Sequence, residues 1–125
     1  MSSIQNLAAP LGRLLLSLVF LLSGVGKMTN YAGTQGFMES VGLPGMLLPL
    51  AIVVEAGCAL LVIIGWQTRH AALLLALFSI ATAVIFHRDF SQMNEMYAFM
   101  KNLGLAGGFL ILYSRGPGAF ALDKA

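Results

Sequence analysis

Charged side chains are scarce in this sequence of 125 residues, because only 10% of them are Asp, Glu, Lys or Arg. Soluble domains carry about 25% charged residues. With 58% hydrophobic residues, the chain has too little polar surface to cover itself in water. The composition therefore excludes an ordinary soluble protein. It predicts an integral membrane protein with one compact domain, residues 1–125.

Cysteine occurs once, at Cys58, which excludes an internal disulfide and a CxxC redox motif. We interpret Cys58, which lies in an apolar run, as a small buried hydrophobe. The seven Lys and Arg residues are scattered and the net charge is only +2, so nucleic acid is not an expected partner. Phosphate-loop, dinucleotide-binding and hydrolase motifs are also missing.

Four apolar runs are long enough to cross a bilayer, which takes about 20 residues per helix. They are residues 10–28, 46–65, 70–87 and 98–114. We considered a cleaved signal peptide for the first run. The "GKMTNYAG" that follows is a poor cleavage site, and three more runs come after it, so we expect a retained helix. The fold class predicted is all-α, an integral membrane four-helix bundle.

The link between the first two runs contains a possible short amphipathic helix, with Phe37, Val41 and Met38 on one face. The following "GLPG" should end it, because Pro44 disfavours the helical conformation at Leu43.

Lys and Arg positions predict the orientation of the bundle. Four spans place both termini and the middle turn on one side. That side would hold Arg13, Arg69, Arg115 and Lys124, and the other side Lys27, Arg88 and Lys101. The positive-inside rule then predicts that both termini are cytoplasmic. Trp66 and Tyr113 would be interfacial anchors on the cytoplasmic side.

Each predicted span also brings a polar residue into the outer half of the bundle. These residues are Lys27, Glu55, His87, Lys101 and Asn102. Charges at membrane depth are costly, so they usually face the bundle interior and pair with one another. We therefore predict that these five residues form one site for ligand binding or proton handling.

Glu55 is the most informative of the five, because nothing on its own helix can neutralise it. Positions 51, 52, 58 and 59 are Ala, Ile, Cys and Ala. Its partner could be Lys27, Lys101, His87 or a proton. Three interpretations stay open: an ion pair that fixes helix packing, a carboxylate that binds a ligand or handles protons, and a neutral side chain hydrogen-bonded to backbone.

The segment "FMKNLGLAGG" favours Lys101 as the other half of the charge pair, with the open question of whether a ligand lies between them. Asn102 could hydrogen-bond to a neighbouring span or cap its own helix. A metal site is not expected: His70 and His87 lie at opposite ends of one run, about 25 Å apart in a helix. We interpret His87 instead as a hydrogen-bonding or proton-accepting residue.

The chain resembles the DoxX family of small bacterial inner-membrane proteins. The matching stretches are "SGVGKMTNYAGTQGFMESVGLPG", "VVEAG", "IGWQTR", "FHRDF", "FMKNLGLAGGFLIL" and "GPGAFALD". The resemblance implies a multi-pass four-helix bundle in the bacterial inner membrane. The family is named after subunits associated with thiosulfate:quinone oxidoreduction, and some members are linked to oxidative stress or detoxification. It supplies no cofactor motif, and it highlights the same five residues.

Three functions remain as hypotheses. The first is a redox-linked subunit that binds a quinone or another small aromatic molecule in the polar pocket, with the bilayer and a redox enzyme subunit as partners. The second is a non-catalytic structural or assembly partner of a membrane redox complex. The third is a small transporter, which would need a homodimer. Since the chain has no redox centre of its own, the sequence leaves open whether it is an enzyme.

Overall fold

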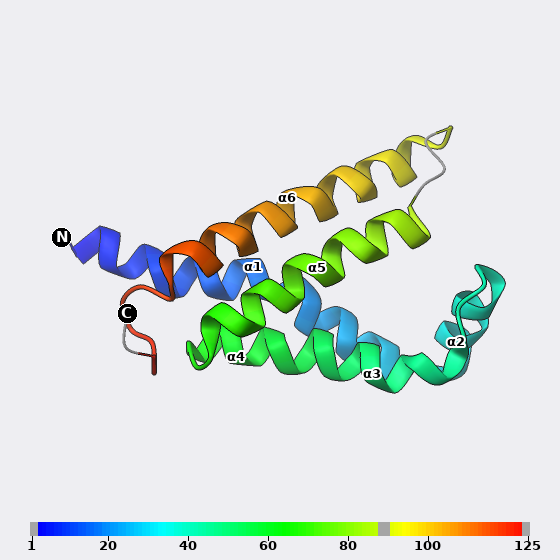
Figure 1. The fold of residues 1–125 in the computed structure, drawn as a ribbon, viewed down its shortest axis with the longest axis horizontal. Coiled ribbons are helices and arrows are strands. Elements are labelled where there is room, and N and C mark those ends of the chain that lie inside the picture. Colours follow the sequence, from blue (N-terminus) through cyan, green and yellow to red (C-terminus); the bar gives the residue numbers. More distant parts are fainter. Residues whose placement is uncertain (1–2, 88–90, 124–125) are drawn as a thin grey trace.

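The computed structural model describes residues 3–87 and 91–123, and every regular element in these ranges is a helix (Figure 1). The elements are α1 (Ser3–Thr29), α2 (Tyr31–Ser40), η1 (Gly45–Leu47), α3 (Leu48–Ile52), η2 (Val53–Gly57), α4 (Cys58–Ile64), α5 (Thr68–Phe86) and α6 (Met93–Arg115). The predicted all-α class is confirmed. Arg88 and Lys124, used above for orientation, lie outside the described residues.

The four predicted spans fall inside α1, the run from η1 to α4, α5 and α6, apart from residues 65 and 87, which lie just past two helix ends. α1 and α6 extend beyond the predicted bounds, because hydropathy detects only the apolar part of a helix and their first turns are polar. Within the described ranges, three helices are long and apolar enough to cross a membrane: Ser3–Thr29, Gly45–Ile64 and Thr68–Phe86. That α6 is a fourth span stays a prediction.

The run from η1 to α4 is one continuous helical rod, in which the backbone adopts three types of helix; α1, α5 and α6 are the other three rods. The run begins as a 3₁₀ turn at Gly45, becomes α-helical with Pro49 in its first turn, and passes through a π turn at Val53–Gly57. Proline is tolerated in a first turn because the N–H that it lacks would have no helical partner there. The rod ends at Gly65, whose φ of 76° is left-handed, a conformation that glycine adopts without strain.

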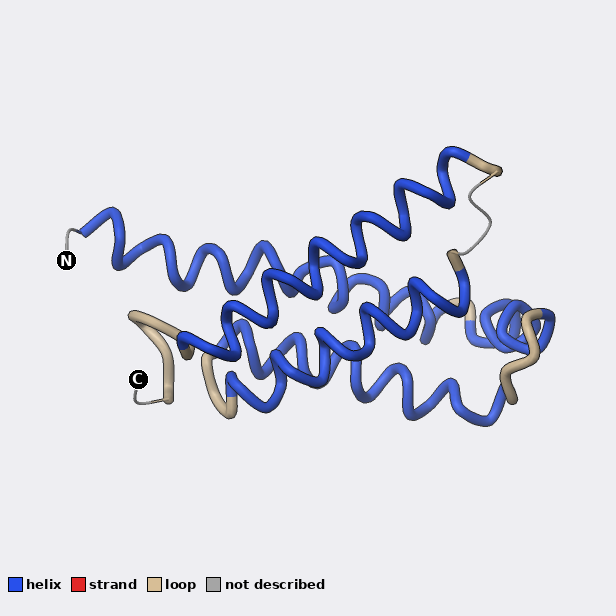
Figure 2. Tube along the Cα trace, turned by 45° about the horizontal axis from the view of Figure 1, so that its top comes forward, coloured by secondary structure: helices blue, strands red, loops and turns tan. Residues whose placement is uncertain are grey.

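The long helices run back and forth between two ends of the molecule (Figures 1 and 2). We call the end with the start of α1, the turn at residues 65–67 and residues 116–123 the terminal end. We call the end with α2, η1 and the first turns of α6 the α2 end. α6 lies along α5 and diverges from α1 towards the α2 end in both views. Near the terminal end, a Cβ added at Gly108 of α6 would lie 3.0 Å from Leu16 of α1.

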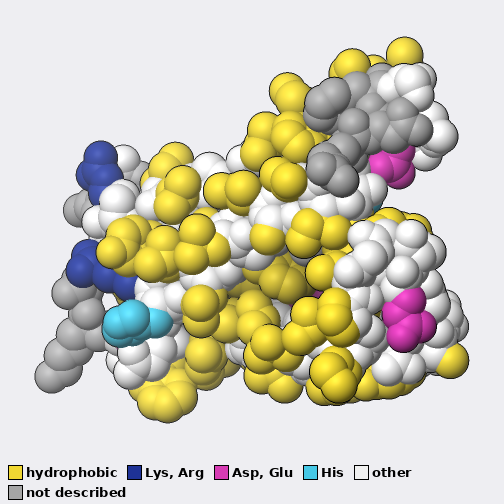
Figure 3. All heavy atoms as spheres, turned by 45° about the vertical axis from the view of Figure 1, so that its right-hand side comes forward, with side chains coloured by type: hydrophobic (Ala, Val, Ile, Leu, Met, Phe, Trp, Pro, Cys, Tyr) yellow, Lys and Arg dark blue, Asp and Glu magenta, His cyan; other side chains and the backbone are white. Residues whose placement is uncertain are grey.

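Many small residues lie inside this fold, beside a few large ones such as Phe109 and Leu75, and many large apolar residues are exposed. The buried core includes Ala59, Ala71, Ala72 and Ala76, which let the helices approach closely. Leucines such as Leu11, Leu15 and Leu22 are exposed. Figure 3 shows hydrophobic side chains over the middle of one face, with Lys and Arg at the terminal end and Asp or Glu towards the α2 end. This distribution suits a lipid surround.

At the terminal end, Arg13 holds the last described residues against the bundle. It lies in α1 and is only 2% exposed. Its Nη1 donates to the carbonyl oxygens of Val62 and Ile63 at 3.3 and 3.0 Å. Its Nη2 donates to those of Ala119 and Phe120 at 3.0 and 2.7 Å. The sequence predicts Arg13 only as a charge on the cytoplasmic side, and this role of the guanidinium group was not predicted.

Asp123 completes the same attachment. Its carboxylate accepts hydrogen bonds from the backbone N–H groups of Gln67 and Thr68, at 2.9 and 2.8 Å. These donors open α5, where a carboxylate is favoured by the unpaired N–H groups and the helix dipole. The hydrogen bond from the Thr68 backbone, opposed by partial burial, holds the pKa of Asp123 below its usual value. The carboxylate therefore caps α5 from another part of the chain.

Candidate functional site

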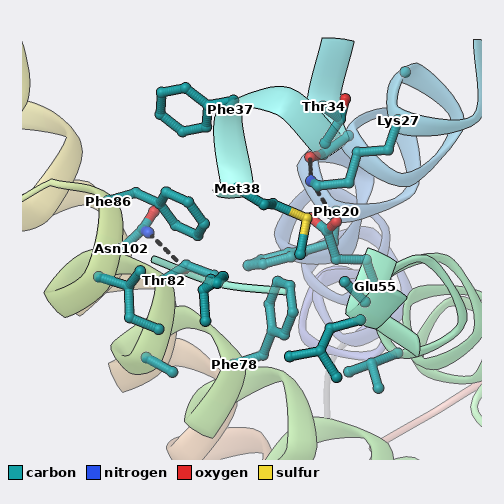
Figure 4. A pocket seen from close by; sticks show the side chains of 18 of the residues that line it. Phe20, Lys27, Thr34, Phe37, Met38, Glu55, Phe78, Thr82, Phe86 and Asn102 are labelled. Carbon is teal, nitrogen blue, oxygen red and sulfur yellow. Dashed lines mark hydrogen bonds and ion pairs between the residues drawn. The ribbon is translucent and has the colours of Figure 1, made fainter. Parts of the chain in front are cut away.

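A cavity of about 680 Å³ lies at the α2 end, between α1, α2, the run from η1 to η2, α5 and α6 (Figure 4). All five residues predicted to form a site line it. They are Lys27, Glu55, His87, Lys101 and Asn102. The structure thus brings together side chains from four helical rods that are far apart in the sequence.

An ion pair between α1 and η2 forms one wall. Lys27 Nζ lies 2.5 Å from Glu55 Oε1, and it also donates to Ser23 Oγ one turn earlier in α1 at 2.8 Å. The Glu55 side chain is 4% exposed and that of Lys27 25% exposed. Of the candidate partners for Glu55, the structure therefore selects Lys27. The interpretation of Lys101 as the other half of the pair is wrong.

The helices approach closely beside this pair because Gly24 has no side chain. A Cβ placed on Gly24 would lie 2.9 Å from the Cβ of Ala56, the residue after Glu55. Glu55 itself lies at the centre of the π turn. A π turn widens the helix locally, and such turns are frequent at functional sites. The close approach of α1 to η2 at Gly24 and the widened π turn together place the Glu55 carboxylate against α1.

The opposite wall is formed by α5 and α6. Asn102 Nδ2 of α6 donates to Thr82 Oγ1 of α5 at 3.1 Å, and Thr82 in turn donates to the carbonyl oxygen of Ser79 at 3.2 Å. This confirms that Asn102 hydrogen-bonds to a neighbouring helix. Thr82 was not predicted, because a single threonine in an apolar run gives no sequence signal.

His87, at the C-terminal end of α5, lies where α6 begins. Its Nδ1 is 3.1 Å from Glu95 Oε2, in the first turn of α6. His87 therefore has the predicted hydrogen-bonding role, and its partner is Glu95 of the same chain. Among the residues that the structure describes, no group of three or more His, Cys, Asp or Glu side chains could hold a metal ion.

Lys101 differs from the other four predicted site residues in its side-chain contacts. It lines the cavity on α6 and is exposed. Within residues 3–87 and 91–123, neither an ion pair nor a hydrogen bond of its ammonium group is found. The cavity therefore carries one cation whose charge no described side chain balances by contact.

Aromatic side chains form the apolar surfaces of the cavity (Figure 4). Phe20 and Phe78 meet edge to face with ring centroids 6.4 Å apart. Phe37 of α2 stacks on Phe86 of α5 with centroids 5.3 Å apart. These rings offer flat, apolar contact to a molecule of similar shape.

α2 covers one side of the cavity, and it confirms that the link between the first two runs contains a short helix. Of the three residues expected on its apolar face, Met38 is buried, whereas Phe37 and Val41 are exposed and Val41 lies one residue past the helix. The helix ends at Ser40, and Gly42 follows with a φ of 89°. Gln35 Nε2 donates to the carbonyl oxygen of Gly45 at 3.3 Å and fastens α2 to η1.

Comparisons with known proteins agree with this architecture. The sequence model of the DoxX family matches residues 8–88, which include Lys27, Glu55 and His87 but not Lys101 or Asn102. The chain is 42% identical to the inner membrane protein YqjF of Escherichia coli (strain K12) over 124 residues, 99% of this chain and 95% of the relative. It is 36% identical to the inner membrane protein YphA of the same organism, over 91% of this chain and 86% of the relative.

No solved structure matches the chain. The family match covers more than half of the sequence, and both relatives match almost end to end. Together with the apolar helices, this makes the chain a multi-pass protein of the inner membrane and a member of the DoxX family.

Proposed function

We propose that this chain is a single-domain, four-span bundle that binds a quinone or another small aromatic molecule in the cavity at the α2 end. α6 has 23 residues, about 35 Å of helix, which is enough to cross the bilayer. Its Lys101 and Asn102 line a cavity, so a membrane-spanning α6 would not have to expose these polar side chains to lipid. Arg69 and Arg115 lie at the terminal end, so the positive-inside rule favours cytoplasmic termini.

The observation that carries the proposal is the composition of one cavity. Ligand pockets measure about 300–1,000 Å³ and combine mostly apolar walls with a few converging polar groups. This cavity, at about 680 Å³, is lined by four phenylalanines and nine polar or charged side chains, which include the five predicted site residues. A quinone ring needs flat apolar contacts and donors for its two carbonyl oxygens. The ammonium group of Lys27 and the amide of Asn102 are donors on opposite walls.

Glu55 supplies the proton chemistry in this proposal. Reduction of a quinone takes up two protons and two electrons, and a buried carboxylate beside the ring can pass a proton to or from a ring oxygen. Lys27, in contact with Glu55, would stabilise the carboxylate when the proton leaves. In this proposal a partner enzyme supplies or accepts the electrons. The role proposed is that of a binding subunit.

Titration of the purified full chain in mild detergent tests the proposal. Short-tailed ubiquinone and menaquinone analogues should bind, and Glu55→Gln and Lys101→Ala should each weaken binding about tenfold or more. Arg115→Ala, a cation removed from the same helix as Lys101 but outside the cavity, is the matched control and should bind normally. Absence of binding by the native chain, or equal binding by all variants, would sink the proposal.

A non-catalytic assembly role is the second candidate, and the Lys27–Glu55 contact favours it. An ion pair already satisfied inside the chain can fix the packing of α1 on η2 without any ligand. In that case Glu55→Gln would lower the stability of the protein, and added aromatic ligands would not change that stability. The native chain would co-purify with a larger redox protein. Isolation with no partner would count against this candidate.

A further inference from the structure

The charges that line the cavity do not cancel. Lys27 is paired with Glu55, and His87 contacts Glu95. Lys101 is the remaining titratable group on the wall, and among the described residues it has neither an ion pair nor a hydrogen bond. With His87 counted as neutral, the described residues that line the wall therefore carry one positive charge in excess, and Glu95 lies outside the lining.

The position of Lys101 makes this excess accessible to a ligand. It lines the cavity from α6, the helix that diverges from α1 towards the α2 end (Figures 1 and 2). Its neighbour Asn102 is fixed by the hydrogen bond to Thr82, which sets the rotation of α6 at this point. Lys101 is exposed at the edge of the cavity, and a negatively charged partner held inside the largely apolar cavity would be screened less than one in bulk water.

We propose that the cavity selects aromatic molecules that carry one negative charge, such as ionised phenols and hydroxyquinones, and that Lys101 is the residue that binds the charge. This rests on the proposed function and narrows its ligand class. The anionic oxygen lies against the Lys101 ammonium group, and the ring extends between Phe20, Phe78 and the α2 residues. The Lys27–Glu55 pair stays neutral as a unit and contacts the far side of the ring.

Two ligands that share one ring system and differ in charge and in a single methyl group provide the test. One is 2-hydroxy-1,4-naphthoquinone, which is ionised at neutral pH. The other is its neutral methyl ether, 2-methoxy-1,4-naphthoquinone. Dissociation constants for both are measured by calorimetry on the native chain, Lys101→Gln, Lys101→Arg and Arg115→Gln, all in one neutral detergent. The ratio of the two constants is compared between proteins, so that partition of the ligands into detergent cancels.

We expect the native chain to prefer the anion, and Lys101→Gln to reduce this preference about tenfold, equivalent to about 1.4 kcal/mol. Lys101→Arg and Arg115→Gln should keep the preference. An unchanged ratio in Lys101→Gln would overturn the inference while binding of both ligands still upheld the proposed function. Binding of neither ligand would overturn both.

A lipid source for the negative charge is tested in the same series. Phosphatidylglycerol offers an anionic head without an aromatic ring, and it is added to the detergent in excess over the naphthoquinone. Preference for the anion should persist, because the phenylalanine walls favour a ring. Complete and Lys101-dependent displacement by this lipid would show that the site takes an anionic headgroup, and would overturn the aromatic assignment.

Discussion

Lys27 of α1 reaches Glu55 in the π turn of η2, with Nζ 2.5 Å from Oε1, and this contact joins two rods beside the candidate ligand cavity. The two side chains differ in exposure, 25% for lysine and 4% for glutamate. Loss of the lysine would leave a charge in an apolar surround, whereas loss of the glutamate would leave a cation that can turn towards the surface. Loss of Lys27 should therefore destabilise the protein more than loss of Glu55.

Removal of one partner from this pair should harm the protein more than removal of both. Lys27→Met should lower stability by about 3 kcal/mol, since it strands the buried carboxylate. The double variant Lys27→Met/Glu55→Gln should recover a large part of that loss. Thermal unfolding of the detergent-solubilised variants measures both effects. A double variant no more stable than Lys27→Met would show that the two side chains act independently.

Gly24→Ala should force α1 away from η2, because its new Cβ would lie 2.9 Å from the Ala56 Cβ and 3.3 Å from the Ala56 backbone nitrogen. Overpacking of this kind costs about 1–3 kcal/mol. Gly12→Ala in the same helix, where a Cβ meets nothing within 4 Å, is the matched control. It should be neutral or stabilising by up to about 1 kcal/mol. Melting temperatures that fall equally for both variants would contradict the close approach at Gly24.

Arg13→Lys should loosen the terminal end even though the charge is kept. A lysine ammonium group cannot reproduce the fork that spans four carbonyl oxygens from two segments. The expected loss of stability is about 2 kcal/mol, and residues 116–123 should become sensitive to added protease. Arg115→Lys, on the exposed end of α6, serves as the control. Equal protease resistance in the two variants would rule out the Arg13 attachment.

Acid should detach the same segment through Asp123. Its pKa is lowered in the folded chain, so the stabilisation is present above the unfolded pKa and is lost as pH falls through the folded value, below about 4. Asp123→Asn should therefore be less stable than the native chain near pH 7. The difference should vanish at low pH. Protease cleavage after residue 115 as a function of pH follows this directly, and a constant difference from pH 7 to pH 3 would refute it.

The spans and the five cavity residues were predictable because the physics behind them is local or strongly one-sided. Hydrocarbon favours long apolar helices, and it favours a paired, inward position for charged residues such as Lys27 and Glu55. The sequence could not decide which lysine meets Glu55. That choice depends on the distance between rods, which Gly24 and the π turn set together.

The attachment at the terminal end was unpredictable for a related reason. Arg13 bonds backbone carbonyl oxygens, which every residue has, so no side chain in the tail marks them. Asp123 looks like an ordinary acid in the sequence and becomes a helix cap only when the tail folds back on α5. Long-range contacts to backbone leave no periodicity to detect.

The bond from Arg13 to Phe120 joins residues 107 positions apart. During synthesis, α1 is made long before residue 120 exists, so the Arg13 guanidinium precedes the acceptors at Ala119 and Phe120. The attachment at the terminal end can therefore form only after residue 120 has been added. A reporter fused after residue 123 would crowd this closing step, whereas one fused before residue 3 would leave it free.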